Sequence, residues 1–142
     1  MSYMPNKLLK EYTQVKAHSG VAYATPHRLV QMLFEGALDK IASAKGHMLR
    51  NELAQKASQI SATMAIVGGL RMSLDKSAGE IARNLDDLYD YMERQLLRAN
   101  YENAAPLLDE VSALLGEIKI SWDVIADSGS AAPSGALVRA VS

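Results

Sequence analysis

The fold follows most directly from the stretch Thr25-Pro-His-Arg-Leu-Val-Gln-Met-Leu-Phe-Glu-Gly-Ala-Leu38. Thr25 can cap the free amides of a helix, and Pro26 suits the first helical position because no hydrogen bond is lost there. One packing partner requires an apolar stripe of about 100°, whereas the apolar side chains of this stretch, placed at 100° per residue, cover roughly 240°. We therefore expect this helix to carry a second hydrophobic surface that something must cover. The apolar residues are Leu29, Val30, Met32, Leu33, Phe34, Ala37 and Leu38.

The rest of the chain repeats the same helical rhythm. Apolar residues recur at alternating steps of four and three, which is the seam spacing of a helical bundle. Short connections make neighbouring helices antiparallel. The sequence therefore predicts an all-α, antiparallel up-down four-helix bundle with a short extra N-terminal helix over residues 8–17. The four long helices are expected over residues 26–50, 52–74, 80–100 and 104–126.

Turn residues predict the helix boundaries and the domain organisation. The run from Ser77 to Glu80 matches a capping box before the helix at residue 80, and Asn103 can cap the helix that follows. We expect residues 1–25 to form a mobile N-terminal segment and linker, residues 26–126 the bundle, and residues 127–142 a flexible C-terminal tail rich in Ser, Gly and Ala.

Composition and charge exclude several classes of protein. The chain of 142 residues is 49% hydrophobic and 6% aromatic, and it has no cysteine, which excludes disulfides and thiolate metal sites. Residues 1–50 carry seven basic and three acidic residues (+4), and residues 51–142 carry eight and thirteen (−5), without a basic cluster. We therefore expect no nucleic-acid binding. Since no apolar run reaches 18 residues, we also expect no membrane insertion and a cytoplasmic location.

The residues that carry chemistry do not form a catalytic or metal-binding pattern. His18, His27 and His47 are scattered, and the Glu-x-x-His pair of a di-metal bundle site is missing. There is no phosphate-binding glycine loop and no Gly-x-Ser-x-Gly elbow. The sequence therefore predicts no enzyme, no cofactor and no metal. Asp86, Asp87 and Asp90 are interpreted as solvated charges that compensate a helix dipole.

The pair Gly68-Gly69 supports two interpretations. Two glycines inside a helix cost about 0.5–1 kcal/mol each relative to alanine. They can mark a kink or close helix packing, or they can leave room for another backbone to lie against this helix. Met32 is also notable, because the apolar seam of its helix is complete without it, and methionine suits surfaces that adapt to a partner.

Three stretches of the chain resemble the flagellin-specific export chaperones (FliS) of bacterial flagellar secretion. The first is Ala24-Thr-Pro-His-Arg-Leu-Val-Gln-Met-Leu-Phe-Glu-Gly-Ala37, with Thr25 where the family usually has Ser. The second is Ile66-Val-Gly-Gly-Leu-Arg-Met-Ser-Leu-Asp75. The third is Asn84-Leu-Asp-Asp-Leu-Tyr-Asp-Tyr-Met-Glu-Arg-Gln-Leu-Leu-Arg-Ala-Asn100, followed by Trp122 in the last helix.

The resemblance implies a cytoplasmic chaperone that holds the C-terminal segment of flagellin, prevents premature polymerisation and supports delivery to a component of the flagellar type III export gate. It also implies that the N-terminal segment covers a hydrophobic pocket and moves on binding. An anti-sigma factor, a co-chaperone and a weak homodimer remain open as further partners. We assign the lid to Leu8, Tyr12 and Val15. The residues predicted to bind the partner are Leu29, Met32, Leu33, Gly36, Ile66, Gly69, Leu70 and Tyr89.

A different class of protein also accounts for the wide apolar arc. In a structural, homo-oligomeric helical bundle, the extra apolar face would be a self-association interface rather than a groove for a client. Self-association and client binding would then compete for the same surface.

Overall fold

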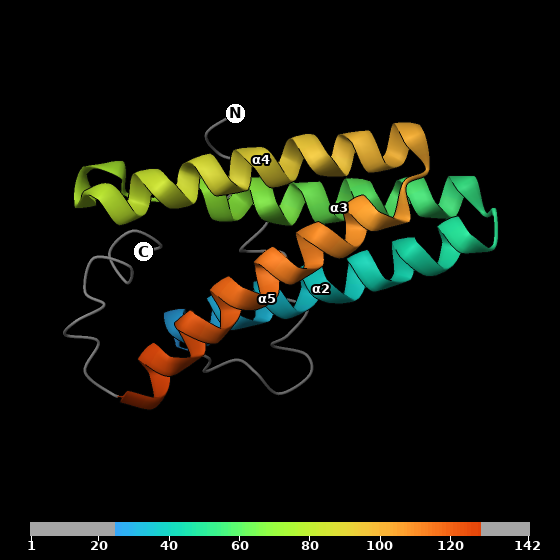
Figure 1. The fold of residues 1–142 in the computed structure, drawn as a ribbon. Coiled ribbons are helices and arrows are strands. Elements are labelled where there is room, and N and C mark those ends of the chain that lie inside the picture. Colours follow the sequence, from blue (N-terminus) through green and yellow to red (C-terminus); the bar gives the residue numbers. More distant parts are fainter. Residues whose placement is uncertain (1–24, 129–142) are drawn as a thin grey trace.

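The computed structural model describes residues 25–128, which form four long helices and no strand (Figure 1). The helices are α2 (Pro26–Leu49), α3 (Leu53–Met72), α4 (Glu80–Glu102) and α5 (Ala105–Ser128), with a 3-10 turn, η1 (Lys76–Ala78), before α4. The predicted all-α bundle is confirmed, and the helix boundaries lie within a few residues of the expected ones. The extra helix over residues 8–17 and most of the predicted tail lie outside the described residues.

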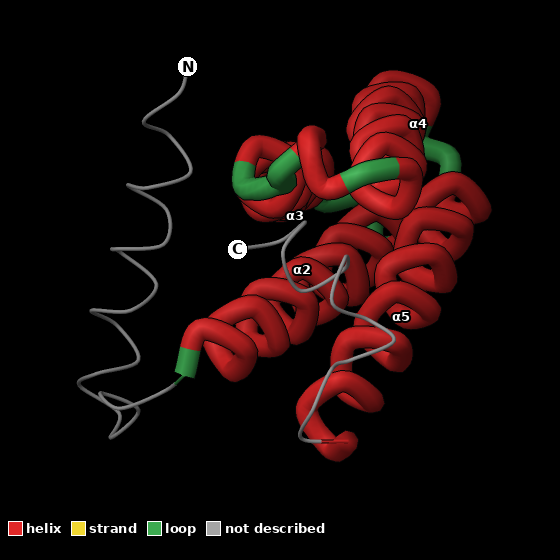
Figure 2. The backbone as a smooth tube through the Cα atoms, turned by 90° about the vertical axis from the view of Figure 1, so that its left-hand side faces the viewer, coloured by secondary structure: helices red, strands yellow, loops and turns green. Residues whose placement is uncertain are grey.

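The four helices pack in two layers that cross each other (Figure 2). α3 and α4 form one layer, and α2 and α5 form the other. Contacts between helices run from α2 to α3 and α5, and from α4 to α3 and α5. Figure 1 shows both helix-helix turns, after α2 and after α4, at the same end of the bundle, whereas α5 diverges from α4 towards the start of α2.

The core is a continuous cluster of buried side chains from all four helices. In α2 the buried residues follow the predicted seam closely, which explains why the 4-3 spacing located this helix correctly. In α4 the buried apolar residues also recur at steps of three and four, at Ala82, Leu85, Tyr89, Met92, Leu96 and Ala99, whereas Ile81, expected on this seam, is 43% exposed. In α5 the buried residues of the predicted seam are Leu108, Val111, Leu115, Trp122 and Ile125. The largest fully buried side chains in the cluster are Phe34, Ile60, Leu70, Tyr89, Met92, Leu96, Leu108 and Leu115.

The helix caps agree with the sequence at α2 but not at α4 and α5. The hydroxyl of Thr25 accepts a hydrogen bond from the Arg28 amide at 3.1 Å, as expected. The predicted capping box is wrong, because η1 occupies residues 76–78 and the Ser77 hydroxyl donates to Asp75. The N-cap of α4 is Gly79 at φ +114°, a conformation that L side chains rarely adopt.

Asn103 ends α4 instead of capping α5. It adopts the left-handed conformation, with φ 53°, and its backbone amide donates to the Ala99 carbonyl. Left-handed residues satisfy the last carbonyls of a helix, and Asn tolerates this conformation better than most residues do. The connection from α4 to α5 is short, and Asn103 could cap either helix. In the structure it caps the end of α4.

A buried lysine fixes the start of α3 to the end of α4. Lys56 is 5% exposed, and its ammonium donates to the Asn100 carbonyl at 2.8 Å and to Asn103 Oδ1 at 2.6 Å. A cation near the C-terminal carbonyls of a helix also interacts favourably with the helix dipole. The Lys56 side chain on α3 therefore caps the C-terminal end of α4.

The substitution Lys56→Met should lower the free energy of unfolding by about 1–3 kcal/mol, because it removes the charged donor of two part-buried hydrogen bonds. Urea unfolding followed by circular dichroism measures the loss. Lys40→Met in α2 is the matched control, since Lys40 is only half-buried, and it should change stability by less than about 0.5 kcal/mol. Equal effects of the two variants would contradict the capping role.

Candidate partner-binding surface

Seven of the eight residues predicted to bind a partner lie on α2 and α3, which pack against each other. The two helices are antiparallel, so the first half of α2 lies beside the second half of α3 (Figure 1). α2 contributes Leu29, Met32, Leu33 and Gly36, and α3 contributes Ile66, Gly69 and Leu70. The helix geometry thus brings together residues that are more than 25 positions apart in the sequence.

These seven residues divide into a buried set and a half-buried set. Met32, Leu33, Ile66 and Leu70 are between 1% and 3% exposed, whereas Leu29, Gly36 and Gly69 are half-buried. The sequence predicts that the second apolar side of α2 must be covered, and in the structure Met32 and Leu33 on α2 are buried. No open apolar face remains at these two residues. Contact of these residues with a partner stays a prediction.

Met32 differs from its neighbour Leu33 in how it is buried. Leu33 belongs to the continuous core cluster, while Met32 does not, although only 2% of Met32 is exposed. The helical spacing explains the difference, because Phe34, Ala37 and Ile41 fill the inner seam of α2 and Met32 lies to one side of it. This matches the expectation that the seam is complete without Met32.

Tyr89 is not part of this surface in the described structure. Its ring is fully buried, with 0% exposed, and it shares one face of α4 with Leu85 and Met92, at steps of four and three residues. Its hydroxyl has no hydrogen-bond partner among the described residues, and burial raises the pKa of Tyr89. The period of α4 points Tyr89 into the core, and its contact with a partner stays a prediction.

The predicted lid residues Leu8, Tyr12 and Val15 lie outside the described residues. Their assignment rests on the sequence and stays a prediction.

The start of α2 is held by the last third of α5. The rings of His27 and Trp122 stack with their centroids 4.5 Å apart, and Trp122 Nε1 donates to the His27 carbonyl at 3.0 Å. Asp123 accepts hydrogen bonds from Gln31 and from Lys119, each at 2.7 Å. Burial alone would raise the pKa of Asp123, but these two hydrogen bonds outweigh it, so its pKa lies below the usual value.

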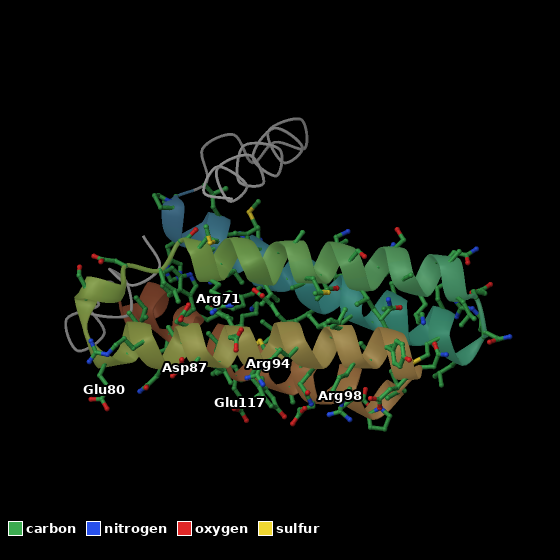
Figure 3. The ribbon with its side chains drawn as sticks, turned by 90° about the horizontal axis from the view of Figure 1, so that it is seen from above. Arg71, Glu80, Asp87, Arg94, Arg98 and Glu117 are labelled. Carbon is green, nitrogen blue, oxygen red and sulfur yellow. The ribbon has the colours of Figure 1, made fainter. Side chains whose placement is uncertain are left out.

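Arg71 joins α3 to α4 through three carboxylates. Its guanidinium lies 2.8 Å from Asp86, 3.1 Å from Asp90 and 3.6 Å from Glu93 (Figure 3). The interpretation of Asp86 as a solvated charge is therefore wrong, because its side chain is 16% exposed and pairs with Arg71. The Asp90 side chain is 41% exposed although it also pairs with Arg71, and Asp87 is exposed as expected. Burial raises the pKa of Glu93, although the nearby Arg71 opposes the rise.

Gly68 lies beneath Glu93. A Cβ atom at Gly68 would sit 3.7 Å from Glu93 Oε1, which is an ordinary van der Waals contact. The close approach of α4 therefore does not require a glycine at this position. Of the two interpretations of Gly68-Gly69, tight packing against α4 accounts poorly for Gly68.

Within residues 25–128, no group of three or more His, Cys, Asp or Glu side chains is arranged to hold a metal ion. None of the helices in this part of the chain is long and apolar enough to cross a membrane.

Comparison with known proteins places these features in a family. A family model described as flagellar protein FliS matches residues 8–129. The chain is 48% identical over 120 residues to the flagellar secretion chaperone FliSB of Pseudomonas aeruginosa, covering 84% of this chain and 95% of the relative. It is 40% identical over 124 residues to the flagellar secretion chaperone FliS of Salmonella typhimurium, covering 86% and 92%. These names describe a secretion chaperone rather than an enzyme.

Removing the Tyr89 hydroxyl should stabilise the bundle. Tyr89→Phe eliminates a buried hydroxyl that has no hydrogen-bond partner within residues 25–128, so the free energy of unfolding should rise by about 1 kcal/mol. Tyr91→Phe is the matched control on the same helix, because the Tyr91 hydroxyl donates to Glu110 at 2.8 Å, and its removal should cost about 0.5–1.5 kcal/mol. Thermal unfolding of both variants tests whether Tyr89→Phe raises the stability and Tyr91→Phe lowers it. A loss of stability in Tyr89→Phe would contradict the conclusion that the Tyr89 hydroxyl is buried without a hydrogen bond.

Stability should depend on pH through Asp123. Because its pKa is lowered in the folded chain, Asp123 contributes stability above the unfolded pKa of about 3.9, and this contribution is lost as pH falls through the lower folded value. Asp123→Asn should therefore destabilise the bundle at neutral pH and make little difference below the folded pKa. Urea unfolding at neutral pH and below the folded pKa of Asp123 measures the two free energies of unfolding. Asp87→Asn is the control, because Asp87 is exposed, and it should change the free energy of unfolding at neither pH.

Proposed function

Because the chain belongs to the FliS family of flagellar secretion chaperones, we propose that it binds the C-terminal segment of newly made flagellin in the cytoplasm. Binding there prevents premature polymerisation and keeps the subunit ready for delivery to a component of the flagellar type III export gate. The terminal segment of a self-assembling filament protein is amphipathic, and an apolar helix face is the surface that such a segment recognises.

The observation that carries this proposal is the composition of the contact between α2 and α3. Leu29 and Met32 lie outside the core cluster on a helix whose inner seam is already filled. Half-buried Gly36 and Gly69 lie on the same two helices and have no side chain to hold another backbone away. We propose that these four residues form an adaptable apolar strip to which a helix or an extended segment of the client binds.

We propose that the N-terminal residues Leu8, Tyr12 and Val15 cover this strip in the absence of flagellin. An uncovered apolar face would promote aggregation, so a local cover is favourable when no client is present. The client would displace this segment on binding, and Met32 would become available to it. The affinity for the client is then reduced by the free energy that holds the lid in place.

Leu29→Glu should weaken binding of a synthetic peptide with the flagellin C-terminal sequence by tenfold or more. Burial of a leucine side chain contributes roughly 1.5–3 kcal/mol, and each 1.4 kcal/mol changes the dissociation constant about tenfold. Leu97→Glu is the control, because Leu97 is 60% exposed on α4, away from the strip. Calorimetry measures the affinities, and circular dichroism verifies that both variants fold. Undiminished binding by Leu29→Glu would place the flagellin site elsewhere.

Deletion of residues 1–16 should increase the fluorescence of an environment-sensitive dye with the free protein and tighten peptide binding. Both effects follow from removal of a competing cover. If neither dye binding nor peptide affinity changes, residues 1–16 are not the lid, whereas the flagellin site itself is still tested by Leu29→Glu.

The homo-oligomeric bundle makes an opposite prediction in sedimentation. A chaperone with a client groove should shift from its free form to a complex as the flagellin peptide is added. A tight dimer that is indifferent to the peptide would favour the oligomer and overturn the proposed function.

A further inference from the structure

The solvent side of α5 is unusually apolar for a surface helix. Ile120 is 66% exposed and Val124 is 59% exposed, one turn apart on the same side. Ala113 is also exposed there, and apart from its chain neighbours and the backbone of its own helix, no described atom lies within 4 Å of the position that a Cβ would take at Gly116. We call this surface, from residue 113 to residue 124, the α5 strip. A surface helix normally places polar residues on this side.

A single charge interrupts the α5 strip. Glu117 is exposed, points away from the bundle (Figure 3), and forms no ion pair within residues 25–128. In contrast, Lys119 and Asp123 on the flank of α5 pair with each other at 2.7 Å. The α5 strip thus offers two β-branched side chains and one carboxylate available for a basic partner.

The sequence that follows α5 matches these features. It contains Ala136-Leu-Val-Arg-Ala-Val141, which is apolar with one basic residue, after the linker Gly129-Ser-Ala-Ala-Pro-Ser-Gly135. Glycine and proline in such a linker favour a change of chain direction. The family model matches residues only as far as 129, so residues 130–142 lie beyond the sequence that it matches.

The lengths also agree. Along α5, Val124 lies about 6 Å and Ile120 about 12 Å before Ser128, and Glu117 lies about 16 Å before it. Eight residues, 129–136, can span up to about 26 Å. The linker can therefore turn back and place Leu137 over Val124, with Arg139 within reach of Glu117.

We propose that residues 136–141 bind back onto the α5 strip of the same molecule. Leu137 and Val141 cover Val124 and Ile120, and Arg139 pairs with Glu117. The contact removes apolar surface from water on the side of α5 that no described helix covers. Because it lies on α5, this contact is independent of the strip between α2 and α3 proposed for flagellin.

Paramagnetic relaxation tests the contact directly. The chain has no cysteine, so Ser142→Cys carries a nitroxide at one site. In the full chain, amide signals of residues 116–124 should lose intensity with the oxidised label and recover on reduction. The loss should disappear in Ile120→Asp/Val124→Asp and persist in the control Leu97→Asp/Tyr101→Asp, which alters an exposed apolar pair on α4.

A charge exchange keeps the test decisive if an apolar variant fails to fold. Glu117→Arg should weaken the intensity loss, and the double variant Glu117→Arg/Arg139→Glu should restore it. No loss over residues 116–124 in the labelled full chain would overturn the proposal. So would a loss that disappears when labelled protein is diluted with unlabelled protein, since a second copy would then be the occupant. Protection of the α5 strip only after addition of the flagellin peptide would assign it to the client instead.

Discussion

The width of the apolar arc on α2 constrains the whole bundle. A single neighbouring helix covers an apolar stripe of about 100°, and α2 presents far more, so it packs against both α3 and α5. α5 reaches the start of α2 only by diverging from α4 (Figure 1). The stacking of Trp122 on His27 and the bond from the indole to the His27 carbonyl hold it there. As a consequence, one long side of α5 faces solvent, with Ile120 and Val124 exposed on it.

Apolar contact is not directional, so polar contacts must select the relative positions of the helices. Arg71 and Lys56 join α3 to α4 at opposite ends, Gln31 and Asp123 join α2 to α5, and Tyr91 donates across from α4 to α5. α2 and α3, by comparison, meet through buried apolar side chains such as Leu33 and Leu70. A polar contact between these two helices, from His47 to Glu52 at 2.8 Å, lies at their turn and away from the proposed flagellin strip. An apolar contact of this kind can adjust to a partner at low cost.

The sequence predicts the bundle well because the seam of each helix repeats within the helix itself. Phe34, Ala37 and Ile41 are buried as the 4-3 spacing requires. Contacts between distant residues leave no such local signal. Nothing near Lys56 shows that its ammonium caps α4, and nothing near Gln31 indicates Asp123, 92 residues later. For the candidate site, spacing indicates which side of α2 is apolar but not how much of Met32 or Leu33 the neighbouring helices cover, and the binding role of these residues stays a prediction.

Several features that cost stability lie in one region of α3 and α4. Gly68 and Gly69 lower the helix propensity of α3. The Tyr89 hydroxyl is buried without a hydrogen-bond partner in the described part of the chain, and Glu93 is a half-buried carboxylate beside two others. Arg71 offsets part of this cost by binding three carboxylates at once. Proteins retain unfavourable local choices mainly where function requires them. The same region borders Gly69 and Leu70, so these unfavourable features lie beside the proposed strip, where binding of a client would require the helices to adapt.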